Sequence, residues 1–237
     1  MSRVLITGGS SGLGACLAAE YAKAGDHVTV ADIVAPQGSA AYAYFDCGQP
    51  DFAWLADAPP FDIVICNAGV SDSEDFLHTD SALDERLMRI NTLGHMALVR
   101  ELLRQEKMAH GGRLAFIVSA SVFLPFPIAI AYAASKAALD GFALALEAYL
   151  VGRRISVTRI YPGPMRTPHA GKYYSRFNEG KGASPEIVAR RIVKALQKRK
   201  QTLIPDMPAR LFYLGSLLCP ALLARLAHRK YFGRRLR

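Results

Sequence analysis

The sequence predicts an α/β fold in which helices cover both faces of one doubly wound parallel sheet. Seven short apolar segments are separated mostly by helical patterns, the order that strand–helix–strand units produce. Several segments, such as "RVLIT" at 3–7 and "DIVICN" at 62–67, are almost continuously apolar, as strands buried on both faces are. A chain of 237 residues, of which 51% are hydrophobic, is long enough for one sizeable core.

The elements follow in a regular order along the chain. The expected strands are residues 3–7, 27–31, 41–45, 62–67, 113–119, 155–160 and 201–205. The expected helices are residues 12–24, 81–108, 131–150 and 185–198, the last with Ser184 as N-cap and Pro185 in the first turn. The segment between Asp32 and Phe45 is too short for a strand and a full crossover helix, so we expect a reduced or missing helix there.

One domain is expected, because no repeat, low-complexity segment or linker divides the chain. Residues 1–208 would form the sheet domain, and residues 209–237 a helical extension of it that is first apolar and then basic. The formal charge of +9 is concentrated near the end, where residues 190–237 carry thirteen Lys or Arg and one acid, Asp206. A basic tail can meet nucleic acid or an anionic membrane surface, although charge alone establishes neither.

The four cysteines are widely spaced and form no C-x-x-C pair and no cluster with the six histidines. We therefore expect neither a disulfide framework nor a metal site. No basic region, apolar core and cleavage-type sequence stand near Met1. These patterns favour a reducing, cytoplasmic compartment.

A glycine-rich turn, "TGGSSGLG" at 7–14, follows the first expected strand and opens a helix. Gly8, Gly12 and Gly14 allow a tight turn and a close approach of the backbone to a pyrophosphate, whose charge the helix N-terminus accepts. The spacing is not G-x-G-x-x-G, and such a turn alone is weak evidence of a phosphate site.

A tyrosine and a lysine stand four residues apart in the alanine-rich helix at 131–150. Tyr132 and Lys136 lie on one face, so the phenol and the ammonium can point into the same space. An ordinary surface pair is the alternative.

Six motifs in order resemble those of the short-chain dehydrogenase/reductase family, which has a Rossmann fold. They are "TGGSSGLG" at 7–14, "NAG" at 67–69, "NTLG" at 91–94, Ser119, "YAASK" at 132–136 and "PGPMRT" at 162–167. The resemblance covers nearly all of residues 3–205, and six ordered motifs are far more specific than any one of them.

The resemblance implies roles for four residues. Tyr132 is the expected general acid/base, which gives a proton to a carbonyl oxygen or takes one from a hydroxyl. Lys136 and the positive nicotinamide ring should lower the pKa of this phenol, and Lys136 should also bind the nicotinamide ribose. Ser119 would hydrogen-bond the substrate oxygen, and Asn91 would help hold a water that links Lys136 to solvent.

Alternatives remain at these positions. Ser121 offers a second hydroxyl on the same strand face as Ser119. Asn91 can instead face solvent or a neighbouring helix. The family usually has glycine near Val122, and this departure affects the pocket wall beside Ser119.

NAD is the expected cofactor rather than NADP. Asp32, just past the second strand, can accept hydrogen bonds from the adenosine ribose and would repel a 2′-phosphate, whereas Ser11 and Ile33 occupy positions that are often basic in NADP-dependent relatives. Alternatively, Asp32 only caps a loop. The expected cofactor-binding residues are Gly8, Ser10, Ser11, Gly12, Leu13, Gly14, Asp32, Ile33, Asp46, Cys47, Asn67, Ala68, Gly69, Tyr132, Lys136, Pro162, Gly163, Met165 and Thr167.

The expected substrate is an apolar or aromatic ketone, aldehyde or alcohol. Residues 164–184 would form a substrate loop containing His169, Tyr173, Tyr174 and Phe177, and "FLPFP" at 123–127 would form another apolar wall. These aromatic residues can equally serve packing. Two other functions are a catalytically silent NAD-binding regulator and a sugar-nucleotide epimerase or dehydratase, which usually has a longer chain.

The apolar run at 211–224 is too short to span a bilayer. We expect residues 209–237 to bury their leucines against a second subunit of a homo-oligomer or over the substrate pocket. Peripheral membrane contact through the basic end is the alternative, and nucleic acid is not the expected partner.

Overall fold

The computed structural model describes residues 1–71, 76–124, 126–166 and 182–233. Seven parallel strands form one sheet in the order β3-β2-β1-β4-β5-β6-β7. Their bounds are β1 Arg3–Thr7, β2 His27–Asp32, β3 Ala41–Tyr44, β4 Phe61–Cys66, β5 Met108–Ile117, β6 Ser156–Ile160 and β7 Thr202–Leu203. The predicted doubly wound parallel sheet is confirmed.

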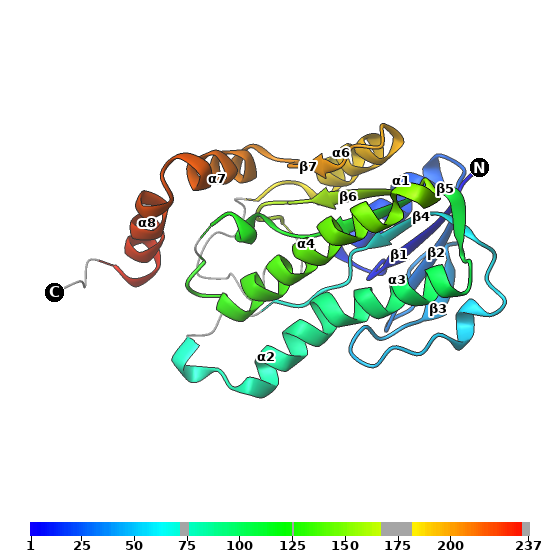
Figure 1. The fold of residues 1–237 in the computed structure, drawn as a ribbon, viewed down its shortest axis with the longest axis horizontal. Coiled ribbons are helices and arrows are strands. Elements are labelled where there is room, and N and C mark those ends of the chain that lie inside the picture. The colour runs from blue at the N-terminus through cyan, green and yellow to red at the C-terminus, as the bar shows by residue number, and fades with distance from the viewer. Residues whose placement is uncertain (72–75, 125, 167–181, 234–237) are drawn as a thin grey trace.

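Helices cover both faces of the sheet (Figure 1). Helices α1 (Gly12–Lys23) and α6 (Pro185–Gln197) pack against each other on one face. Helices α2 (Ser81–Met88), α3 (Gly94–Arg104) and α4 (Ile130–Leu150) cover the other. None of the described helices is both long and apolar enough to cross a membrane.

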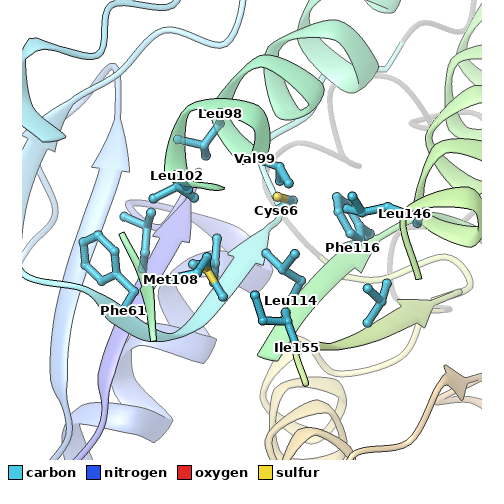
Figure 2. Packing of buried hydrophobic residues seen from close by; sticks show 14 of the residues in the cluster. Phe61, Cys66, Leu98, Val99, Leu102, Met108, Leu114, Phe116, Leu146 and Ile155 are labelled. Atoms are coloured by element: carbon cyan, nitrogen blue, oxygen red, sulfur yellow. The ribbon is translucent and has the colours of Figure 1, made fainter. Parts of the chain in front are cut away.

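The hydrophobic core has two halves, because alternate residues of each strand point to opposite faces. Phe116 of β5 belongs to one half together with Leu98 of α3 and Leu146 of α4, and Figure 2 shows Phe116 beside Leu146. Its neighbour Ile117 belongs to the other half, with Leu17 of α1 and Ile192 of α6. The central strands are therefore buried on both faces, which explains their continuously apolar sequences.

The extent predicted for the helix at 81–108 is wrong. This helix is divided by a π-helical segment at Arg89–Leu93 and ends at Arg104, where Glu106 adopts a left-handed conformation with a φ of 55°. Strand β5 then begins at Met108, five residues before the expected start, because Met108 pairs with Phe61 of β4. The strand expected at 201–205 is reduced to two residues.

The expected lack of a helix between the second and third strands is confirmed. Residues 33–40 connect β2 to β3 by bends and irregular backbone. Strand β3 has β2 on one side and ends the sheet, and its Tyr42 and Tyr44 are exposed.

The C-terminal extension forms two helices, α7 (Met207–Leu218) and α8 (Pro220–Phe232), which pack against each other. Asp206 caps α7 by accepting a hydrogen bond from Ala209 N at 2.9 Å. Gly215 lies within α7 at the contact with α8, where an added Cβ would come within 3.0 Å of Leu223 Cδ1. Figure 1 shows both helices at the end of the molecule opposite the N-terminus.

Candidate active site

A large cavity lies at the carboxyl ends of the central strands, where the strand order reverses between β1 and β4. Ligands of open α/β sheets bind at such a switch point. Its volume of about 1140 Å³ exceeds that of most pockets for drug-sized ligands. Its walls contain most of the expected site residues: Gly8, Ser11, Gly12, Leu13, Asp32, Ile33, Asp46, Cys47, Asn67, Ala68, Gly69, Ser119, Tyr132, Lys136, Pro162, Gly163 and Met165.

Three expected site residues lie behind this wall rather than in it. Gly14 is packed against the carbonyl of Gly8, Ser10 donates its backbone N–H to Asp32, and Asn91 lies next to Gly69. Thr167 lies outside the described residues, as do the substrate-loop residues His169, Tyr173, Tyr174 and Phe177.

The turn between β1 and α1 requires glycine at three positions. Gly8 and Gly12 have φ values of +64° and +51°, which other residues rarely adopt. A Cβ on Gly8 would lie 2.7 Å from Ala68 Cα, and a Cβ on Gly14 would lie 2.0 Å from the carbonyl oxygen of Gly8. The turn thus places the N-terminus of α1 at the cavity, an arrangement that accepts a phosphate.

Thr7, at the end of β1, holds the loop after β4 beside this turn. Its hydroxyl oxygen accepts hydrogen bonds from Asn67 N at 2.9 Å and Ala68 N at 3.0 Å. The Asn67 side chain returns two hydrogen bonds, both at 3.0 Å, to the carbonyls of Thr7 and Gly8. Thr7 stands in the motif at 7–14, but the sequence alone does not indicate this role.

Asp32 stands at the end of β2 with its carboxylate on the cavity wall. One carboxylate oxygen accepts a hydrogen bond from Ser10 N at 2.9 Å, and the other accepts one from Val34 N at 3.3 Å. Asp32 therefore does cap a loop, as the alternative held, and it also presents a negative charge to the cavity. The two interpretations are compatible.

Ser119, Tyr132 and Lys136 come together at the other end of the cavity. Ser119 follows β5, whereas Tyr132 and Lys136 lie in the first two turns of α4. The Lys136 ammonium is almost completely buried and donates a hydrogen bond to the carbonyl of Ile117 at 2.9 Å. Burial lowers the pKa of Lys136 to about 8.

The expected lowering of the Tyr132 pKa is wrong for the chain as described. Burial raises the pKa of this phenol above its ordinary value of 10, and a hydrogen bond with the Ser119 side chain offsets the shift only in part. The phenol is therefore protonated at neutral pH.

Both Ser119 and Ser121 line the cavity. Ser119 caps a short 3₁₀ turn at Ala120–Val122, and its hydroxyl accepts a hydrogen bond from Ser121 N at 3.1 Å. The buried hydroxyl of Ser121 has no hydrogen-bond partner among the described residues. Val122 packs against the core.

Asn91 lies in the π-helical segment and is fully buried. Its side-chain oxygen accepts a hydrogen bond from Val70 N at 2.8 Å, and its amide donates to the Val70 carbonyl and to Ser135 of α4, both at 2.9 Å. The alternative in which Asn91 faces solvent is wrong, whereas contact with a neighbouring helix is present. Asn91 fixes the loop after β4 to the helix that carries Tyr132 and Lys136.

His95, which the sequence argument missed, connects the two halves of the site. Its Nδ1 lies 3.3 Å from the carbonyl oxygen of Asn91, and its Nε2 lies 3.2 Å from the Thr7 hydroxyl oxygen. A neutral ring protonated at Nδ1 satisfies both contacts, since Thr7 already accepts two backbone N–H groups and can donate its own proton. No local signal predicts this contact between residues 88 positions apart.

Burial of this ring predicts a dependence of stability on pH. It lowers the pKa of His95 from 6.5 to about 3. Between these values the unfolded chain binds a proton that the folded chain does not, so stability falls as the pH is lowered through this range, by up to about 1.4 kcal/mol per pH unit. We expect His95→Gln to reduce this slope, as measured by urea unfolding at several pH values.

His110→Gln is the matched control, because it makes the same replacement at an exposed histidine of β5. Equal slopes for wild type and His95→Gln would contradict a buried, neutral His95.

Part of the cavity wall is apolar and aromatic, with Lys230 of α8 beside it. This part includes Leu124 and Phe126, from the segment expected to form an apolar wall, together with Phe212 of α7 and Tyr231 of α8. No leucine of α7 or α8 is among the residues that line the cavity, so the prediction that these leucines cover the pocket is wrong. The aromatic residues of the two helices cover it instead.

The family follows from comparison with known proteins. A model of the short chain dehydrogenase family matches residues 53–177, more than half of the chain. The chain is also 32% identical to a dehydrogenase/reductase SDR family protein 7-like of Drosophila melanogaster, over 92% of this chain and 77% of that protein. The chain belongs to the short-chain dehydrogenase/reductase family. It is an oxidoreductase of this family.

Three further proteins resemble this chain in sequence or in fold. A fatty acyl-CoA reductase of Acinetobacter baylyi is 34% identical, over 82% of this chain and 72% of that protein. A short chain dehydrogenase of Burkholderia cenocepacia in complex with NADP has a TM-score of 0.83 at 19% identity, with 95% and 97% of the two chains covered. A 3-ketoacyl-(acyl-carrier-protein) reductase of Brucella melitensis complexed with NADH has a TM-score of 0.75 at 21% identity, with 86% and 95% covered.

Proposed function

We propose that this protein is an NAD-dependent oxidoreductase that interconverts a ketone or aldehyde and the corresponding alcohol. The observation that carries the proposal is the meeting of Ser119, Tyr132 and Lys136 in one cavity with the glycine turn of β1 and α1. A proton donor therefore lies in the same space as a cradle for a dinucleotide.

The residues present fit a nicotinamide dinucleotide. The glycine turn has no room for a Cβ at Gly8 or Gly14, so backbone rather than side chains forms the surface for a pyrophosphate. Gly69 lies beside Lys136, where an added Cβ would come within 3.3 Å of Nζ. Asp32 would hold the adenosine ribose, Asn67 and Ala68 would flank it, and Pro162 and Gly163 would lie beside the nicotinamide. When bound, the nicotinamide exchanges a hydride with the substrate carbon.

Tyr132 would act as the proton donor when a carbonyl is reduced. Its phenol is protonated at neutral pH, because burial raises its pKa. Ser119 would hydrogen-bond the substrate oxygen as negative charge develops on it. Lys136, with a pKa of about 8, would remain mainly protonated at neutral pH and would stabilise the tyrosinate left by proton donation. In the oxidative direction the tyrosinate form of Tyr132 would accept the proton of the alcohol.

The preference for NAD over NADP rests on Asp32. We expect Asp32→Asn to bind NADPH about tenfold more tightly, because removing a charge a few ångströms from a 2′-phosphate relieves about 1 kcal/mol or more of repulsion. Asparagine has one side-chain oxygen, so it can keep the hydrogen bond from Ser10 N at 2.9 Å and loses the longer one from Val34 N at 3.3 Å. Fluorescence titration of both variants with NADH and NADPH measures the change. Tighter binding of NADPH than NADH by the wild type would contradict the proposal.

The substrate is proposed to be apolar or aromatic, since Leu124, Phe126, Phe212 and Tyr231 line part of the cavity. The proposed compartment is reducing and cytoplasmic, which accords with the four free cysteines, Cys16, Cys47, Cys66 and Cys219. Assembly as a homo-oligomer remains a prediction.

A panel of ketones, aldehydes and alcohols, followed by NADH absorbance, tests the proposed function. We expect turnover of apolar carbonyl compounds with NADH and less with NADPH. Binding of NADH without turnover of any member of a broad panel would instead support the silent regulator.

A further inference from the structure

The C-terminal helices present an apolar face to the outside of the molecule. Along α7 this face consists of Met207, Leu211, Leu214, Leu217 and Leu218, which are 51 to 77% exposed. The opposite face of α7 carries small or aromatic residues, with Ala209 fully buried and Tyr213 packed on Phe123 at a ring distance of 4.9 Å. The leucines are therefore directed away from the core, the reverse of an ordinary surface helix.

Helix α8 also exposes leucines and adds positive charge. Leu222 and Leu226 are each more than half exposed, and the exposed Arg225 and Arg229 lie one and three positions from Leu226. Ala227, between them, is buried. The outer face of α8 is therefore both apolar and basic. We call the exposed side chains of Met207, Leu211, Leu214, Leu217, Leu218, Leu222, Arg225, Leu226 and Arg229 the hairpin face.

The hairpin has no negative charge to balance these arginines. No Asp or Glu occurs after Asp206 in the sequence, whereas seven Lys or Arg do. Asp206 itself is buried and points inward, where it accepts hydrogen bonds from Gly163 N at 2.8 Å and Ala209 N at 2.9 Å. Two copies that met through this face would bring like charges together, whereas an anionic lipid surface would complement them.

We propose that the hairpin face docks on an anionic membrane surface, with its leucines in the interface and its arginines at the lipid headgroups. Helix α7 has 12 residues and is thus about 18 Å long, which is short of the about 30 Å of a hydrocarbon core. The two helices lie on the membrane rather than cross it.

Docking in this way brings the cavity next to the lipid. Phe212, Lys230 and Tyr231 belong to the same two helices and line the cavity, and the ring of Tyr231 lies 5.5 Å from that of Phe126. One side of the hairpin is therefore the membrane surface and the other is a pocket wall. An apolar carbonyl compound or alcohol dissolved in the membrane would reach the site beside these rings; this second step rests on the proposed function.

Sedimentation with lipid vesicles tests the docking. We expect the full chain to bind phosphatidylcholine vesicles that contain phosphatidylserine and to bind pure phosphatidylcholine much less. The double variant Leu217→Glu/Leu218→Glu should lose at least about 100-fold in partition coefficient. For Arg225→Gln/Arg229→Gln, the partition coefficient on anionic vesicles should fall about fivefold per charge removed. On neutral vesicles it should change little.

Leu144→Glu/Val151→Glu is the matched control, because it also places two acids on exposed aliphatic positions, 53% and 73% exposed, but lies outside the hairpin. It should bind vesicles as the wild type does. Equal binding by the wild type and Leu217→Glu/Leu218→Glu would overturn the proposal. A lower molecular mass of that variant in lipid-free buffer would also overturn it, in favour of a subunit interface.

Turnover separates the second step from the first. With a short, water-soluble ketone, Leu217→Glu/Leu218→Glu should equal the wild type, because neither leucine lines the cavity. With a long-chain ketone dissolved in anionic vesicles, the turnover rate of this variant should fall as its binding to the vesicles falls. Equal rates on the long-chain ketone would overturn membrane delivery. Absence of all turnover would count against the proposed function, while the sedimentation result still decides the docking.

Discussion

Tyr132→Phe should lower kcat by about 10²- to 10⁴-fold, the usual contribution of one positioned general acid. The substitution removes a single oxygen and leaves the glycine turn and Asp32 in place. Loss of one hydrogen bond weakens NADH binding by about tenfold at most. Stopped-flow turnover on the best carbonyl substrate and fluorescence titration with NADH measure the two effects separately.

Tyr149→Phe is the matched control for this variant. Tyr149 lies on the same helix, α4, but is 67% exposed and has the Arg153 guanidinium over its ring. It should keep wild-type kcat. A Tyr132→Phe enzyme that retained a tenth or more of wild-type kcat would show that another group donates the proton.

The second large effect is expected at the glycine turn. In Gly14→Ala the new methyl group would lie 2.0 Å from the Gly8 carbonyl oxygen and 2.6 Å from Asn67 Nδ2. The first of these is backbone, so α1 must move away from the turn. We expect a loss of about 3 kcal/mol in the free energy of unfolding and, because the helix N-terminus shifts, NADH binding weaker by about 100-fold.

Gly141→Ala provides the comparison. Gly141 lies inside α4, where an added Cβ meets no atom within 4 Å. Alanine there should raise the free energy of unfolding by about 0.5–1 kcal/mol. Each kcal/mol raises the Tm of a chain of this size by about 2–4 °C. Thermal unfolding and NADH titration measure both variants. If Gly14→Ala bound NADH as the wild type does, close packing at Gly14 would not position the turn.

The strands were predictable because of their environment. A segment such as "DIVICN" is apolar at nearly every position, since helices cover both of its faces. The start of β5 was not predictable, because "MAHGG" contains polar residues and glycines and joins the sheet only through the pairing of Met108 with Phe61. The π-helical segment at Arg89–Leu93 was missed because it joins α2 directly to α3, so the helical pattern continues through it.

Within the candidate site, prediction succeeded for residues whose role depends on local backbone and failed for contacts made across the fold. The glycines of 7–14 follow from the turn geometry at the start of a helix. His95 has no such local signal, since Thr7 and Asn91 hold it only after the sheet has formed. The prediction that leucines of α7 and α8 cover the pocket failed for a related reason. On the inner side of these helices the buried residues are Ala209 and Ala227.

The outer edge of β3 bears on how this protein tolerates concentration and engineering. β3 has four residues, "AYAY", and carries no charged side chain or proline on that edge. Edge strands of this kind are templates for pairing with another chain, and natural proteins blunt them with lysine, proline or short length. In this protein the short length of β3 limits such pairing. Mutations that extend the apolar stretch at 41–44 would lengthen the edge strand that is available for pairing with another chain. Tyr44→Lys would instead reduce self-association during storage.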